Sequence, residues 1–136
     1  MGSKEREVNR RRNTTEQPAL GRPLFWIGSS KNDISQMPAP VKASFGYRLR
    51  RIQESKSAAD IKALPQFGAG VFELRVAYDR NAYRVVYVLA LKTAVYVLHA
   101  FMKKSKSGIG LPKTDVNLIQ VRLKRAQELD AEKYHG

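Results

Sequence analysis

Cysteine is absent from the 136-residue sequence, and histidine occurs only twice. The lack of cysteine excludes a disulfide framework and a thiolate zinc site, and it fits a reducing cytoplasm. Long apolar runs are also missing, since no stretch approaches the roughly 20 residues of a membrane helix and the N-terminus has no apolar signal-peptide core. We therefore expect a cytoplasmic protein that contacts no membrane and has neither metal nor cofactor.

Acidic residues are scarce, with 12 Asp and Glu against 25 Lys and Arg, which gives a formal net charge of +13. The imbalance is greatest between Asp79 and Asp115, where the sequence has no acidic residue. The basic residues of this segment are Arg80, Arg84, Lys92, Lys103, Lys104, Lys106 and Lys113. Such an excess indicates an anionic partner, and nucleic acid is favoured over membrane because no strongly apolar amphipathic helix accompanies the charge. The alternative is a solvated basic face without a partner.

The composition also divides the chain into two parts. Residues 1–21 have almost no apolar content and include the triplet Arg10, Arg11 and Arg12, so we expect a disordered basic arm. Residues 22–136 have the length and apolar content of one domain with one core.

Helical and strand periods alternate along this domain. A short aromatic run, residues 22–28, predicts a strand, and residues 31–37 predict a short helix. Val41, Phe45, Leu49 and Ile52 then recur at helical spacing and predict an amphipathic helix with a buried stripe. Its outer face is basic and is a candidate rim for an anionic partner; for RNA contact we select Arg48 and Arg51 from it.

Three further strands are predicted at residues 71–78, 82–90 and 93–101, and the short turn at Asp79–Asn81 favours an antiparallel meander. A last helix over residues 114–133 presents Val116, Ile119, Leu123 and Ala126 on one side. This order predicts an α+β fold: a small, mainly antiparallel sheet with helices packed on one face and the other face at least partly open. In the strand predicted at residues 93–101, alternation places the side chains of His99 and Phe101 on the opposite face from those of Leu98 and Ala100.

Five segments in order carry a resemblance to a known family. They read PLFWIGSSKNDISQMP, GVFELR, YRVVY, VYVLHAFMKKSKSGI and LPKTDVNLIQVRLKRA. The sequence resembles the phage-derived Gp49-like proteins, the HigB-like branch of the RelE/ParE toxin superfamily, from Pro23 to about Leu129. The resemblance implies a compact toxin, an antitoxin partner that is usually a HigA-like helix-turn-helix protein, and metal-independent cleavage of messenger RNA on the ribosome.

The resemblance also implies site residues. Arg75 of ELR and Arg84 of YRV match the strand arginines of the family, and Lys103 and Lys104 match its F-x-K-K-S motif. His99 is the candidate for proton transfer, because histidine is the side chain that titrates near neutrality. Two further lysines complete the expected RNA contacts, Lys106 and Lys113. Simpler roles stay open: ion pairing or surface exposure for the arginines, nonspecific RNA contact for the lysines, and a semi-buried structural place for His99.

Two other functions remain possible at this point. A ParE-like inhibitor of DNA gyrase would share the fold, and a basic protein could bind nucleic acid without catalysis. The arginines and paired lysines together favour the endonuclease, because a gyrase inhibitor needs no constellation that stabilises a phosphate.

Overall fold

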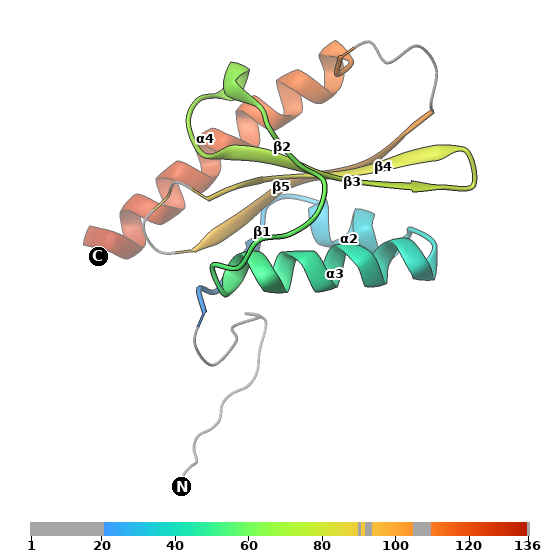
Figure 1. Cartoon of the computed structure of the whole chain (residues 1–136). Helices are drawn as coiled ribbons and strands as arrows, with labels where there is room; N and C mark the ends of the chain where they lie inside the picture. Colours follow the sequence, from blue (N-terminus) through green and yellow to red (C-terminus); the bar gives the residue numbers. More distant parts are fainter. Residues whose placement is uncertain (1–20, 90, 92–93, 105–109, 136) are drawn as a thin grey trace, which may run out of the picture.

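The computed structural model describes residues 21–135 except 90, 92–93 and 105–109, and it describes the backbone but not the side chains of Lys104, Tyr134 and His135 (Figure 1). The predicted basic arm, residues 1–21, lies outside the described residues apart from Gly21. The described elements are β1 (Leu24–Trp26), α2 (Ser30–Ser35), α3 (Ala39–Gln53), β2 (Ile61–Ala63), the 3-10 helix η2 (Pro65–Phe67), β3 (Val71–Tyr78), β4 (Asn81–Val88), β5 (Val95–Lys104) and α4 (Lys113–His135). None of the described helices has the length and apolar character needed to cross a membrane.

The strands form one sheet in the order β1-β5-β4-β3-β2. β1 runs parallel to β5, and every other neighbouring pair is antiparallel. The turn between β3 and β4 consists of Asp79 and Arg80, whose φ angles of 49° and 67° give the left-handed pair that a tight hairpin requires. The predicted meander is therefore confirmed, while the three-residue strand β2 was not predicted from the sequence.

Helix α3 covers one face of the sheet. Val41 and Phe45 are fully buried and pack in one cluster with Leu74 of β3 and Val85 of β4. Pro38 occupies the N-cap and Pro40 lies in the first turn, where a missing N–H costs nothing. The apolar stripe predicted for this helix is confirmed.

Helix α4 covers the opposite face, as Figure 1 shows. Its Ile119 and Ala126 are fully buried and pack in a second cluster with Val86 and Tyr96. The α+β class and the mainly antiparallel sheet are confirmed, but the prediction that the helices pack on one face was wrong. The reason lies in β4, where consecutive residues from Val85 to Val88 are all buried, so that both faces of the central strands are apolar and need a cover.

A β-bulge in β5 corrects a second detail. His99 pairs with Val86 but Val97 pairs with Tyr87, which leaves Leu98 as an extra residue. Leu98 packs in the α4 cluster and His99 contacts α4 as well, so both side chains lie on the same face. Simple alternation had placed them on opposite faces, and a bulge breaks that alternation.

The α4 face is open at the far edge of the sheet. Pairing between β2 and β3 ends at Ile61 and Leu74, so β3 forms the sheet edge from Arg75 onward. Lys62, Arg75 and Ala77 are exposed there. This open part of the α4 face holds most of the residues considered next.

Candidate functional site

Arg75, Arg84 and Phe101 form a row across three neighbouring strands. Arg75 lies directly opposite Arg84, and Arg84 lies directly opposite Phe101. Because Leu74, Val76 and Val85 face α3, their neighbours Arg75 and Arg84 face the α4 side. Like charges directly opposite each other on antiparallel strands destabilise a sheet, so this pair breaks a local rule of folding.

Glu73 compensates for part of that charge. Nη1 of Arg84 donates to both carboxylate oxygens of Glu73, at 3.1 and 3.2 Å. The pair is buried, with side-chain exposures of 12% for Arg84 and 2% for Glu73. Nε of Arg84 is also buried and has no acceptor among the described residues. Arg84 is thus held in place by one carboxylate while one of its donors stays unused.

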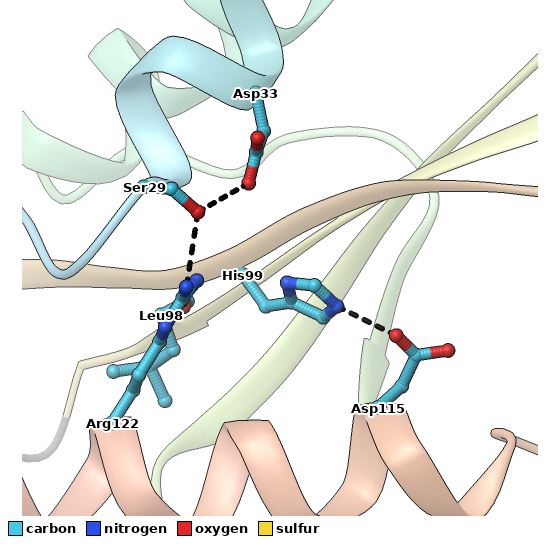
Figure 2. Close-up of polar contacts among 6 residues, drawn as sticks. All are labelled: Ser29, Asp33, Leu98, His99, Asp115 and Arg122. Atoms are coloured by element: carbon cyan, nitrogen blue, oxygen red, sulfur yellow. Dashed lines mark hydrogen bonds and ion pairs between the residues drawn. The ribbon is translucent and has the colours of Figure 1, made fainter.

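His99 is joined to the first turn of α4. Its Nε2 lies 2.8 Å from Oδ1 of Asp115, as Figure 2 shows. Its ring also stacks on Phe101, with the two ring centroids 4.5 Å apart. A carboxylate accepts a hydrogen bond, so the neutral imidazole carries its proton on Nε2 and its lone pair on Nδ1. Nδ1 is buried and has no partner among the described residues. This geometry favours a positioning role for His99 over direct contact with a substrate.

A second polar connection holds α4 to the sheet near the bulge. Nη1 of Arg122 donates to the carbonyl oxygen of Leu98 at 3.0 Å, and Nη2 donates to Oγ of Ser29 at 3.0 Å. Oγ of Ser29 in turn donates to Asp33 at 2.7 Å, as Figure 2 shows. The backbone approaches Arg122 closely at Gly28, whose φ is +58°, so that a Cβ there would lie 2.7 Å from Nε of Arg122.

The lysines of the F-x-K-K-S motif lie at the end of β5. Lys103 pairs with Ala82 and therefore faces the same side as Arg84, and its Nζ donates to the carbonyl oxygen of Gly110 at 2.9 Å. Lys113 is exposed at the first residue of α4. The side chain of Lys104 and the whole of Lys106 lie outside the described residues, so their predicted roles remain predictions.

The two arginines predicted from α3 lie on the opposite side of the sheet. Arg48 is buried and donates to the carbonyl oxygens of Ala59 and Arg75 and to Oγ of Ser44. Burial lowers the pKa of Arg48, and the charge of Asp60 partly opposes that shift. These contacts connect α3 to the loop before β2 and to β3, so the geometry favours a structural role for Arg48 over a contact with RNA.

Arg51 is more accessible, and its guanidinium lies 5.9 Å from the ring centroid of Tyr47, a side chain that is 64% exposed. Both residues line a hollow of about 760 Å³ on the α3 side, to which Arg75 also contributes. A smaller hollow of about 350 Å³ is lined by Lys62, Glu73 and Arg75. Arg75 lines both hollows because it lies at the sheet edge, and Asp60 lines both as well.

Glu73 and Asp115 were not among the site residues expected from the sequence. Glu73 is the first residue of ELR, but its contact with Arg84 depends on the strand register, which places the two on diagonal positions. Asp115 ends the segment without acidic residues, and only the packing of α4 brings it to His99. In the sequence, the only indication of either residue was that a single acidic side chain occurs close to the basic candidate site residues.

The match to protein families covers most of this structure. The model of the Gp49-like phage-derived proteins matches residues 32–124, which include α3, the four strands β2 to β5 and the first half of α4. A comparison with curated proteins finds no significant match. Over this range the chain belongs to the family of phage-derived Gp49-like proteins.

Proposed function

We propose that this protein is the toxin of a type II toxin-antitoxin system and that it cleaves messenger RNA on the ribosome. Membership of the Gp49-like family is compatible with a toxin of such a system. One observation carries the proposal: Arg75 and Arg84 lie directly opposite each other, and a single buried carboxylate accompanies them. A sheet that keeps such a repulsive pair loses stability, and violations of this kind are expected at functional sites.

The proposed reaction is an attack of the RNA 2′-oxygen on the neighbouring phosphorus. The O2′–P bond forms and the P–O5′ bond breaks, which gives a 2′,3′-cyclic phosphate and a 5′-hydroxyl that takes its proton from water. On the way the phosphorus passes through a state whose equatorial oxygens carry extra negative charge. Arg84, Arg75 and Lys103 lie on one side of the sheet and can donate to these oxygens. Removing one such preorganised donor typically lowers the rate by a factor of about 100 to 1000.

The reaction also needs a group that accepts the proton of the 2′-hydroxyl. Two groups of this face have the chemistry, the carboxylate of Glu73 and the imidazole of His99. Both side chains are buried, but Glu73 lines a hollow together with Arg75, whereas His99 lines neither of the two hollows beside Arg75. We assign the proton acceptor role to Glu73, and to His99 with Asp115 the role of holding α4 and Phe101 beside Arg84.

Ribosome dependence follows from the same geometry. In the free protein Glu73 is already bound to Arg84, so a phosphate must compete with the carboxylate for the guanidinium. A ribosome that holds the message in an attack-ready conformation contributes several kcal/mol to lowering the barrier. Beyond the site, the half-buried Arg51 and the exposed Tyr47 offer a cation and an aromatic ring to the message on the α3 side of the sheet.

The remaining partner is a cognate antitoxin, which we propose to be a helix-turn-helix protein of the HigA type. An acidic segment of the antitoxin can pair with the exposed Arg75 and Lys62 and cover the hollow that they share with Asp60 and Glu73, which would keep RNA away.

The test is translation of a reporter message in a cell-free system, with primer extension to locate cuts. Wild-type protein should give discrete cuts within codons, and Arg84→Ala and Lys103→Ala should not. Arg125→Ala is a matched control, because Arg125 is an exposed arginine of α4 whose ion pair within the described part of the chain is with Glu128. Intact message together with inhibited DNA supercoiling by purified gyrase would refute the proposal, and so would equal cleavage by wild type and Arg84→Ala.

A further inference from the structure

A third hollow lies on the face of the sheet away from the proposed RNA site, between β1, α2 and α3. It has a volume of about 320 Å³. Its apolar lining consists of Leu24, Trp26, Ile34 and Leu49. Gly46 of α3 also lines it, and a Cβ built on Gly46 would meet nothing within 4 Å. The missing side chain therefore leaves space that a visiting apolar group can fill.

The rim of this hollow is basic. Lys31 of α2 and Lys42 and Arg50 of α3 line it, and none of its ten lining residues is acidic. Arg50 pairs with Glu54 at 3.5 Å, and the Arg50 side chain is 62% exposed. Pairs in which one partner is this exposed hold weakly, so Arg50 remains able to bind another anion. The basic outer face predicted for α3 thus surrounds an apolar floor, and this arrangement has no part in the proposed cleavage.

We propose that this hollow binds an amphipathic helical segment of another protein, with apolar side chains along one side and carboxylates on its flanks. An apolar stripe laid into a groove is a common mode of helix recognition. Here the floor would accept the stripe, and the three cations of the rim would pair with the flanking carboxylates. The proposal stands independently of the RNA chemistry, because Gly46 and Arg84 face opposite sides of the sheet.

Three other occupants fit less well. The N-terminal residues 1–20 of this chain carry more basic than acidic side chains, so the rim would repel them. A second copy of the chain has the same net charge of +13. RNA would satisfy the rim, but it has no aliphatic groups to bury against Leu24, Ile34 and Leu49.

Trp26 makes the proposal measurable, because it is the single tryptophan of the sequence and lines the hollow. The probe is a synthetic helical peptide of about 14 residues, four helical turns, with leucines at helical spacing and glutamates on both flanks. Titration with this peptide should change the fluorescence of Trp26 saturably. The same peptide with lysine in place of glutamate should bind at least tenfold more weakly, and replacing Lys31, Lys42 and Arg50 with glutamate should reverse that preference.

Gly46→Met supplies the blocking variant. The methionine side chain enters open space and also raises helix propensity, so the protein should fold and melt no lower than wild type. It should lower peptide affinity at least tenfold and leave message cleavage unchanged. Ala43→Met is the matched control, since Ala43 is an exposed residue of α3 that does not line the hollow.

Three results would overturn the proposal. The first is the lack of a saturable change with the acidic peptide up to about 1 mM, where even weak specific binding is detectable. The second is unchanged affinity in a folded Gly46→Met protein. The third is that a short single-stranded RNA changes the fluorescence of Trp26 as much as the acidic peptide does, and that Gly46→Met abolishes this change. The hollow would then be a contact for RNA. Cleavage of the message is measured separately from peptide binding. Failure of the peptide to bind therefore leaves the proposed endonuclease function intact, and failure of cleavage leaves the proposed peptide site intact.

Discussion

Replacing Glu73 with glutamine should destabilise the protein strongly, although the change removes only a charge. Removing one partner of a buried ion pair leaves the other charge uncompensated, which typically costs about 3 to 5 kcal/mol of unfolding free energy. Glu73 is 2% exposed and Arg84 12% exposed, so this regime applies. For a domain of this size, about 3 °C of melting temperature corresponds to each kcal/mol, so the variant should melt roughly 10 °C lower.

A double-mutant cycle measures the pair itself. Arg84→Gln and the double variant Glu73→Gln/Arg84→Gln should show a coupling free energy of about 2 kcal/mol in urea unfolding, because the double variant leaves no buried charge alone. Arg125 and Glu128 are a matched control pair, 3.6 Å apart and both more than half exposed, with an expected coupling below about 0.5 kcal/mol. Equal coupling free energies in the two cycles would refute the claim that Glu73 and Arg84 form a strongly coupled buried pair.

Arg75→Gln removes the repulsion with Arg84, so it should leave the free energy of unfolding unchanged or raise it by up to about 1 kcal/mol.

Three further predictions concern other parts of the structure. Gly28→Ala should lower the free energy of unfolding by at least about 1 to 2 kcal/mol in urea titration, because alanine is strained at a φ of +58° and its Cβ would displace Arg122; an unchanged midpoint would argue against this close approach. Burial raises the pKa of Tyr87 to about 12 from the ordinary value of 10, so its contribution to stability is complete below about pH 10 and is lost as pH rises toward 12. Tyr87→Phe should flatten the fall of melting temperature over this range, and an identical slope in both proteins would contradict the assignment. Asp115→Asn should increase hydrogen exchange in the first turn of α4 and reduce cleavage, and Asp115→Glu should restore both in part; unchanged exchange would show that the contact with His99 does not hold this turn.

The sequence predicted most of the fold because its periodic signals were strong. The stripe from Val41 to Ile52 and the alternation from Val71 to Tyr78 each matched one period, and both elements were found where expected. The placement of α4 was missed because the run from Val85 to Val88 is apolar throughout, and the sequence does not say which element covers the second face of such a strand. The strand β2 was missed because three exposed residues carry no apolar pattern.

The candidate site was only partly predictable. Sequence motifs suggested Arg75, Arg84 and Lys103 as candidates, and the strand register places all three on one side of the sheet. Their relation to Glu73 depends on strand register, and that of His99 to Asp115 depends on the packing of α4, neither of which a single sequence specifies. Arg48 belongs to the same helical pattern as Arg51, yet its contacts with Ala59 and Arg75 bury it, because a long side chain on a helix flank can turn toward the core as well as toward solvent.

The most direct test of the proposed activity compares catalysis with binding. Single-turnover cleavage of a message held on ribosomes is measured beside ribosome pelleting, for wild type, for Arg84→Ala and for a protein in which Arg10, Arg11 and Arg12 are replaced by glutamine. We predict that Arg84→Ala lowers cleavage about 100-fold while ribosome binding changes less than about threefold, because it removes one donor to developing charge but only one of many phosphate contacts. The triple replacement should weaken binding at high salt and leave cleavage of bound message unchanged. If both proteins lose binding and cleavage in the same proportion, Arg84 belongs to a general electrostatic surface and the proposed catalytic site is wrong.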